Sequence, residues 1–155
     1  MSQSLARILV HLTFSTKDRR PLIRDQERDK LHAYIIGVMK NHDSPSLETN
    51  SVSDHVHILF SLSRNHALAK VIGEVKEASS AWIKTQDACY RDFYWQGGYA
   101  AFSVSESQVE KVRPYIRNQR EHHQQVSFQD ESFQDESRAL FEKHKVAYDE
   151  RYAWN

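Results

Sequence analysis

Two groups of residues have the types and spacing needed for chemistry, and the first is a pair of histidines. In the run Asp54-His-Val-His-Ile-Leu-Phe60, His55 and His57 alternate with apolar residues. Successive side chains of a β-strand point to opposite faces, so the two imidazoles should project together from the face opposite the apolar residues. Two imidazoles on one face can ligate a divalent ion. A His-x-His pair alone, however, is more typical of ordinary half-exposed strand histidines.

The second group lies in Val112-Arg-Pro-Tyr-Ile-Arg-Asn-Gln-Arg-Glu-His-His123. On a helix Tyr115 and Gln119 would lie about 40° apart, and His122 within about 20° of Tyr115. A phenol one turn from a metal ligand can act as a nucleophile on a phosphate that a Lewis-acidic ion polarises. Taken alone, this pattern is more typical of a packed tyrosine and a solvated glutamine. Neither ordinary interpretation predicts its combination with the histidine pair.

The elements that must position these residues can be read from the spacing of apolar side chains. Alternation with period two predicts strands, and recurrence every three to four residues predicts amphipathic helices. Ser105 and Gln108 form a capping-box pattern, which predicts that a third helix begins there. We expect strands near 5–14, 47–52, 55–62 and 100–104, and helices near 24–40, 67–85 and 105–123. This order predicts an α+β fold with ferredoxin-like βαββαβ topology, an antiparallel sheet and two helices on one face. The third helix, which carries Tyr115, is an addition.

Length and composition restrict the class of protein. The 155 residues predict a single domain, 1–155, able to bury a core without disulfides. The lone Cys89 is typical of a reducing cytosol, and no apolar run approaches the length of a membrane span, so we expect a cytoplasmic protein with no membrane partner.

Charge is distributed unevenly along the chain. The 21 basic and 21 acidic residues cancel, so the chain as a whole is not drawn to nucleic acid. Residues 1–40, however, hold eight Lys or Arg and only four Asp or Glu. Lys17, Arg19 and Arg20 are the best candidates for contacts with DNA phosphates, although a solvated turn would have the same composition. Trp95 and Tyr99 could stack on unpaired bases, but such aromatic residues more often pack in a core.

At the histidine pair and the Tyr115 segment the sequence resembles the single-tyrosine transposases of the HUH class (His-hydrophobic-His). The smallest bacterial insertion sequences encode these enzymes, and the REP-associated tyrosine transposases are among them. The resemblance covers nearly the whole chain. The segments that carry it are VHLTFSTKDRRP, DHVHILFSL, YWQGGYAAFSVS, YIRNQREHH and YDERYAWN.

The resemblance implies a Mg²⁺- or Mn²⁺-dependent transposase. Such an enzyme recognises DNA hairpins at element ends, cuts single-stranded DNA and forms a 5′-phosphotyrosine with a free 3′-OH. Carried over residue by residue, Tyr115 is the nucleophile, His55 and His57 are metal ligands, and Gln119 is the third ligand. The resemblance also implies a homodimer in which the tyrosine helix of one subunit completes the histidine site of the other.

One feature departs from the family pattern. Residues 127–131, Ser-Phe-Gln-Asp-Glu, are repeated immediately as 132–136. Five extra residues in a continuous helix would rotate everything downstream by about 140°, so we expect a loop to absorb the repeat. This divides the chain into a catalytic core, 1–125, and an extension, 126–155.

Two alternatives stay open. The first is an inactive or domesticated protein of the same fold, which would bind DNA hairpins without forming a covalent adduct. The second is a ferredoxin-like domain with no role on nucleic acid, in which His55 and His57 hold Zn²⁺. The presence of His55, His57, Tyr115 and Gln119 together favours an active transposase, because loss of function would leave any of them free to change.

Overall fold

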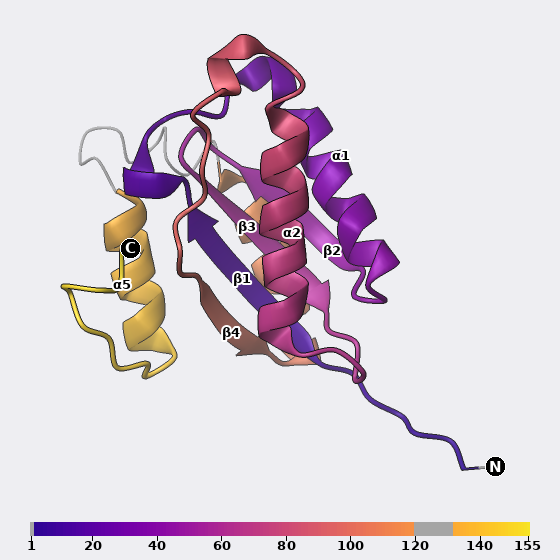
Figure 1. The fold of residues 1–155 in the computed structure, drawn as a ribbon. Coiled ribbons are helices and arrows are strands. Elements are labelled where there is room, and N and C mark those ends of the chain that lie inside the picture. Colours follow the sequence, from indigo (N-terminus) through magenta and orange to yellow (C-terminus); the bar gives the residue numbers. More distant parts are fainter. Residues whose placement is uncertain (1, 120–131) are drawn as a thin grey trace.

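The computed structural model describes residues 2–119 and 132–155, which form one four-stranded sheet and the helices that cover it (Figure 1). The strands and α-helices are β1 (Leu9–Ser15), α1 (Asp25–Asn41), β2 (Ser46–Ser51), β3 (His55–Ser61), α2 (Leu68–Ile83), β4 (Ala100–Val104), α3 (Val109–Arg117) and α5 (Phe133–Lys143). Three short 3₁₀ helices are η1 (Lys17–Arg19), η2 (Ala88–Tyr90) and η3 (Glu106–Gln108). None of the helices in the described part of the chain has the length and apolar character needed to cross a bilayer.

The strands lie in the order β2-β3-β1-β4, and every neighbouring pair is antiparallel. β1 is central, and its register with β3 sets Leu12 opposite Ile58 and Thr13 opposite His57. This order and the βαββαβ sequence of elements confirm the predicted ferredoxin-like α+β fold.

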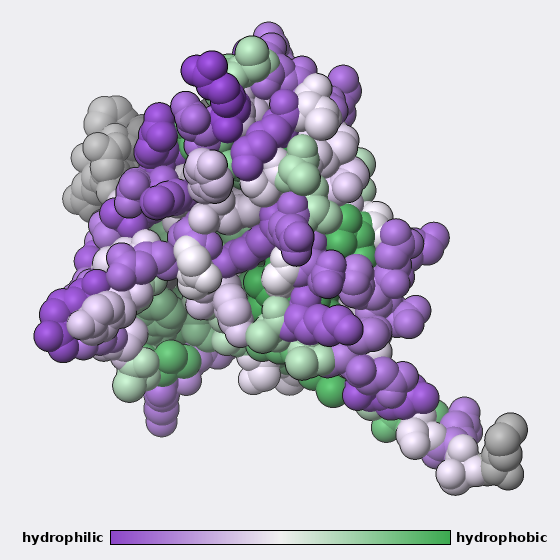
Figure 2. Space-filling model, viewed as in Figure 1, coloured by the Kyte–Doolittle hydropathy of each residue, from purple (hydrophilic) through white to green (hydrophobic). Residues whose placement is uncertain are grey.

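One face of the sheet is apolar and lies beneath α1 and α2 (Figure 1). The alternate residues of β1 and β3 supply its strand side, with Leu12, Phe14, Ile58 and Phe60 fully buried. The helices contribute apolar stripes at helical spacing, and their outward surface is mainly hydrophilic (Figure 2). Burial of each large aliphatic or aromatic side chain stabilises the fold by about 1.5–3 kcal/mol.

Trp95 belongs to this apolar core. Its indole is 8 % exposed, packs edge-on against Phe14 with ring centroids 4.8 Å apart, and donates a hydrogen bond from Nε1 to Ser79 Oγ. Trp95 is therefore a packing residue in this structure, whereas the side chain of Tyr99 is exposed.

The opposite face of the sheet is covered by α3 and α5. α3 packs on β2 and β3 through a small apolar cluster that includes Leu59, Val109 and Ile116. α5 lies along the same face, where Phe141 is 6.0 Å from Phe102 of β4 between ring centroids. The polar residues of β1 and β3 are thus enclosed between α3 and α5.

Two local expectations are corrected. Ser105 precedes the 3₁₀ helix η3 rather than an α-helix and makes no side-chain capping hydrogen bond, so the predicted capping box is wrong. α3 begins at Val109 instead, and the part of the expected helix beyond residue 119 lies outside the described residues.

The second copy of the repeated segment forms the start of α5 rather than a loop. Ser132 caps this helix, its Oγ accepting a hydrogen bond from the Asp135 backbone N–H at 3.1 Å. Phe133 and Glu136, one turn apart, are both buried against the sheet. Burial and the cap therefore favour helix for residues 133–136, and the first copy, 127–131, lies outside the described residues.

Candidate metal and tyrosine site

The histidine pair lies on the face of the sheet away from α1 and α2, as the alternation in β3 predicts. His55 and His57 are 1 % and 0 % exposed, so they are enclosed rather than half-exposed strand histidines. Their ring centroids are 5.2 Å apart. Burial of two imidazoles requires hydrogen-bonding partners for their nitrogens, and the structure provides them.

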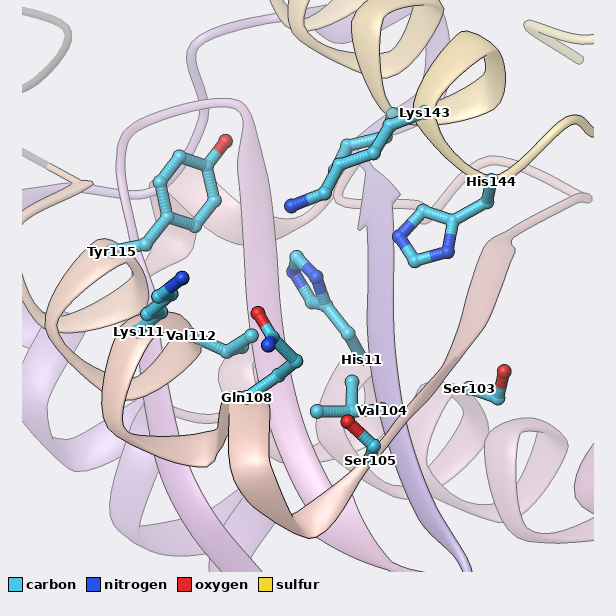
Figure 3. A pocket seen from close by; sticks show the side chains of 11 residues that line it. His11, Ser103, Val104, Ser105, Gln108, Lys111, Val112, Tyr115, Lys143 and His144 are labelled. Carbon is cyan, nitrogen blue, oxygen red and sulfur yellow. The ribbon is translucent and has the colours of Figure 1, made fainter.

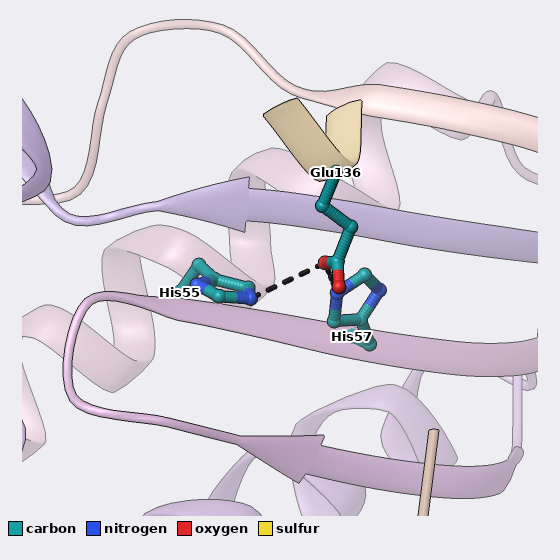
Figure 4. Close-up of side chains that lie close together, drawn as sticks. All are labelled: His55, His57 and Glu136. Atoms are coloured by element: carbon teal, nitrogen blue, oxygen red, sulfur yellow. Dashed lines mark hydrogen bonds and ion pairs between the residues drawn. The ribbon is translucent and has the colours of Figure 1, made fainter. Parts of the chain in front are cut away.

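A carboxylate from α5 lies between the two imidazoles (Figure 4). Glu136 Oε1 accepts a hydrogen bond from His57 Nε2 and lies 3.4 Å from His55 Nε2. One ligand atom from each of His55, His57 and Glu136 lies within 4.8 Å of the others. Two β3 side chains and one α5 side chain therefore converge on one point.

The remaining ring nitrogens hold the imidazoles in orientation. His55 Nδ1 donates to Asp54 Oδ1 at 2.7 Å. His57 Nδ1 shares a hydrogen bond of 2.9 Å with Nε2 of His11, a buried residue of β1. Both Nε2 atoms are thereby directed toward Glu136. In metalloproteins a hydrogen bond to the second ring nitrogen commonly orients a ligating histidine in this way.

The electrostatics of the site favour one positive charge between the imidazoles. Burial lowers the pKa of His55, but hydrogen bonds to Asp54 and Glu136 outweigh this and raise it to about 9. Burial, together with the nearby His57, lowers the pKa of His11 to about 3, so His11 is neutral near pH 7. The carboxylates thus stabilise a cation at the pair, while His11 serves it as an uncharged partner.

The described residues fit a divalent metal ion. Two imidazole nitrogens and one carboxylate oxygen are a mixed N/O donor set, which suits Mn²⁺ or Zn²⁺ and tolerates Mg²⁺. The stabilised positive charge and the two oriented Nε2 atoms support the same interpretation.

Tyr115 of α3 lies beside the pair in the same chain. Its ring centroid is 5.7 Å from that of His57 and 6.1 Å from that of His11, and it meets both rings edge-on. The side chain is half-buried, so solvent and a ligand can reach it. The predicted phenol and the predicted histidines are therefore brought together without a second subunit.

The position of Tyr115 follows from how α3 is anchored. Ile116, next in sequence, is fully buried in the apolar cluster under α3. Asn50 of β2 donates from Nδ2 to the carbonyls of Ile116 and Arg117, at 2.9 and 2.8 Å. Arg117 also pairs with Glu48. The end of α3 is thereby held on β2, which directs the preceding tyrosine toward β1 and β3.

Gln119 lies one turn after Tyr115 and is fully buried. Its Nε2 donates a hydrogen bond of 3.4 Å to the Tyr115 carbonyl. Burial agrees poorly with the solvated glutamine of the ordinary interpretation. Its role as a third metal ligand stays a prediction.

The basic residues of the first segment lie at the end of β1. η1 contains Lys17 and Arg19, and its Asp18 and Arg19 have positive φ angles of 58° and 56°. Thr16, which precedes η1, donates its backbone N–H to the Asp54 carbonyl at 2.8 Å. Lys17 and Arg20 are exposed. This basic turn therefore lies at the His55 end of the sheet, and its contact with DNA phosphates stays a prediction.

Two residues of the site, His11 and Glu136, were not among the predicted ligands or partners. Alternation in β1 does assign His11 to the polar face, but pairing with β3 is needed to bring it to His57. Glu136 had a weaker signal: Ser132 followed three residues later by Asp135 is typical of a helix start. That pattern predicts α5 but not its position against β3.

The fold and the site together define a ferredoxin-like α+β protein with a histidine pair beside a tyrosine on the face of its sheet that α3 and α5 cover. The family model described as "Transposase IS200 like" matches residues 4–119. The chain belongs to this transposase family, as the sequence resemblance predicted. No curated protein matches the chain.

Two solved structures share the fold. One is a candidate transposase from Deinococcus radiodurans R1, with a TM-score of 0.58 and 21 % identity over 77 % of this chain and 98 % of that chain. The other is a REP-associated tyrosine transposase bound to a REP hairpin, with a TM-score of 0.59 and 15 % identity over 79 % of this chain and 74 % of that one.

Proposed function

We propose that this transposase cuts and rejoins single-stranded DNA through a covalent bond to Tyr115, with a divalent metal ion held by His55 and His57. The observation that carries the proposal is the position of the Tyr115 ring beside His57, which in turn contacts Glu136. The family of the chain supports strand transfer as its outcome.

The cutting step exchanges one ester for another. Tyr115 Oη attacks the scissile phosphorus, an Oη–P bond forms, and the bond from phosphorus to the 3′ oxygen breaks. The phenol loses its proton and the leaving 3′ oxygen gains one. The phosphotyrosine conserves the bond energy of the diester, so a second 3′-OH can later attack it and rejoin two strands.

The protein supplies orientation and charge for this step. His55 and His57, oriented by Asp54 and His11, would hold the metal ion, with Glu136 and the predicted Gln119 as further oxygen ligands. When bound, Mg²⁺ or Mn²⁺ stabilises the charge that develops on the phosphate oxygens. Glu136 belongs to the extension 126–155, so we assign this segment a part in the site.

The test is a denaturing-gel assay with labelled single-stranded DNA from the flanks of the protein's own gene. We expect a covalent adduct with Mg²⁺ or Mn²⁺, none with EDTA, and none with Tyr115→Phe. Tyr152→Phe is the matched control, because Tyr152 is 66 % exposed and lies in the C-terminal segment. Hairpin binding without an adduct would identify an inactive or domesticated DNA-hairpin-binding protein. Zn²⁺ binding without DNA binding would identify a ferredoxin-like domain that has no role on nucleic acid.

DNA hairpins are the proposed substrate, because a structural neighbour is a REP-associated transposase bound to one. We assign contacts with hairpin phosphates to Lys17, Arg19 and Arg20. Removing any one of these cations should reduce the slope of log affinity against log salt by about 0.7–0.9. A slope unchanged in Lys17→Ala/Arg20→Ala would count against this assignment.

Exchange of the tyrosine helix between two subunits can be tested by mixing. One protein carries Tyr115→Phe and the other His57→Ala, so neither has a complete site. If subunits exchange helices in a homodimer, the mixture regains adduct formation. If the arrangement within one chain is the active one, which the contact between Tyr115 and His57 favours, the mixture stays inactive.

A further inference from the structure

A pocket of about 540 Å³ opens beside Tyr115, between α3, β4 and the end of α5 (Figure 3). Tyr115 and His11 form part of its wall, so the pocket adjoins the phenol on one side and the histidine network on the other. Its volume lies within the range of about 300–1,000 Å³ that is usual for small-molecule sites.

The pocket is basic although the chain as a whole carries no net charge. Lys111 of α3 and Lys143 of α5 line it from two sides, and the described lining residues include no Asp or Glu. In Figure 3 the Lys143 side chain reaches toward the space between Tyr115 and His11. An anionic ligand would therefore be attracted to the side of the pocket nearest the phenol.

The rest of the lining combines apolar and hydrogen-bonding side chains. Val104, Val112 and Leu140 provide apolar surface, and Ser105 and Gln108 provide donors and acceptors. A planar base needs both kinds of contact, apolar for its faces and polar for its edge, whereas inorganic phosphate needs only the lysines.

We propose that this pocket holds one nucleotide of the single strand, the nucleotide joined to the phosphate that Tyr115 attacks. The proposal rests on the proposed function and names where its substrate lies. A strand whose phosphate lies at the phenol must place an adjoining nucleoside close by, and the pocket opens at that point. Lys111 and Lys143 then contact its flanking phosphates, and the apolar wall contacts the base.

The first experiment fills the pocket without changing its charge. The probe is a fluorescein-labelled strand of twelve thymidylates, titrated at low salt with EDTA so that no cutting occurs. Ser105→Trp should weaken binding about tenfold. Ser107→Trp is the matched control, because Ser107 does not line the pocket and the two serines share one hydrogen bond of 3.1 Å, which either substitution removes.

The second experiment removes charge from the pocket. Lys111→Ala/Lys143→Ala should weaken binding of the same probe about tenfold and lower the salt slope by about 1.4, as expected for two contacts with single-stranded DNA. Lys30→Ala/Lys40→Ala on α1 is the control, since Lys40 lies in the last turn of its helix as Lys143 does. The control should bind as the wild type does.

Different results would contradict the nucleotide site and the proposed transposase chemistry. Wild-type affinity in both Ser105→Trp and the Lys111/Lys143 variant would overturn the nucleotide site, even if wild-type protein forms the Tyr115 adduct. Failure of the wild type to bind the twelve-thymidylate strand would overturn it as well. Absence of any adduct, with the probe still bound through the pocket, would instead overturn the proposed chemistry. Loss of affinity only in the lysine variant would reduce the site to phosphate attraction and reject the bound base.

Discussion

The two faces of the sheet are built from the same strands, but they are stabilised by different interactions. On the face under α1 and α2, residues such as Leu12 and Ile58 are buried by apolar contact alone. On the face under α3 and α5, the neighbouring His11 and His57 are equally buried but form hydrogen bonds that reach Glu136. Because side chains alternate along a strand, a residue that stabilises the core and a residue of the candidate site can be direct neighbours in the sequence.

This difference explains why the second face is suited to a reaction. Apolar packing is non-directional and tolerates exchanges of similar volume. A buried polar network requires each donor and acceptor to be matched, so its side chains have defined orientations. Asp54 and His11 provide this matching for the histidine pair without being expected ligands themselves.

The largest expected effect comes from the polar face. His57→Asn should reduce Tyr115 adduct formation by at least about a thousandfold, because it removes a proposed metal ligand and the contact with Glu136. The adjacent Ile58→Val, on the other face, should leave adduct formation within about twofold of wild type. Quantifying the adduct with Mn²⁺ for both variants measures the contrast. Comparable losses in the two variants would show that the faces are not functionally separate.

The converse prediction concerns stability. Ile58→Ala removes most of a fully buried side chain from the apolar core, which should lower the free energy of unfolding by about 2–5 kcal/mol. Urea denaturation followed by circular dichroism measures this change. Thr49→Ala, on the partly exposed strand β2, provides a comparison that should cost less. A loss below about 1 kcal/mol for Ile58→Ala would mean that this core relaxes around the cavity.

The third prediction tests the partner of His57. His11→Leu leaves His57 Nδ1 without its hydrogen-bonding partner, so Mn²⁺ affinity should fall about 10–100-fold. His11→Gln can donate or accept at a similar place and should recover most of the affinity. Isothermal titration with Mn²⁺ compares the three proteins, with thermal unfolding to verify their folding. Wild-type affinity in His11→Leu would show that His11 is only a packing residue.

The sequence predicts the apolar face better than the polar one, for a physical reason. The apolar face follows from periodicity within each element, as the strands and helices around Leu12, Ile35, Ile58 and Val75 show. The histidine pair and Tyr115 were predicted as well, because each signal lies within one element. Within this chain Tyr115 lies beside His57, and completion of the site across two subunits, which the resemblance implies, stays a prediction.

The residues that were missed depend on contacts between distant elements. His11 meets His57 only through the pairing of β1 with β3. Glu136 reaches the pair only because α5 docks on the sheet, and the repeat in residues 127–136 obscured that helix. Five added residues change the phase of a continuous helix, but the cap at Ser132 lets α5 begin independently of what precedes it. This local helix start sets the phase of α5, and with it the position of Glu136 beside the histidine pair.

The smallest predicted effect is a pH dependence of stability that comes from a titratable residue on the apolar side of the sheet. His32 of α1 is buried, shares a hydrogen bond of 2.7 Å with Ser51 Oγ, and has its pKa lowered by burial to about 4. The unfolded chain takes up this proton near pH 6.5, so the stability that neutral His32 contributes is present above that pH and is lost as pH falls toward 4.

Between pH 7 and pH 5 this linkage should lower the free energy of unfolding by about 1–2 kcal/mol in the wild type relative to His32→Gln. Gln keeps a neutral hydrogen-bonding group at this position but does not titrate. Urea midpoints of both proteins, measured at several pH values in this window, test the difference. Parallel pH profiles would mean that folded His32 takes up its proton at the same pH as the unfolded chain, so that burial does not lower its pKa.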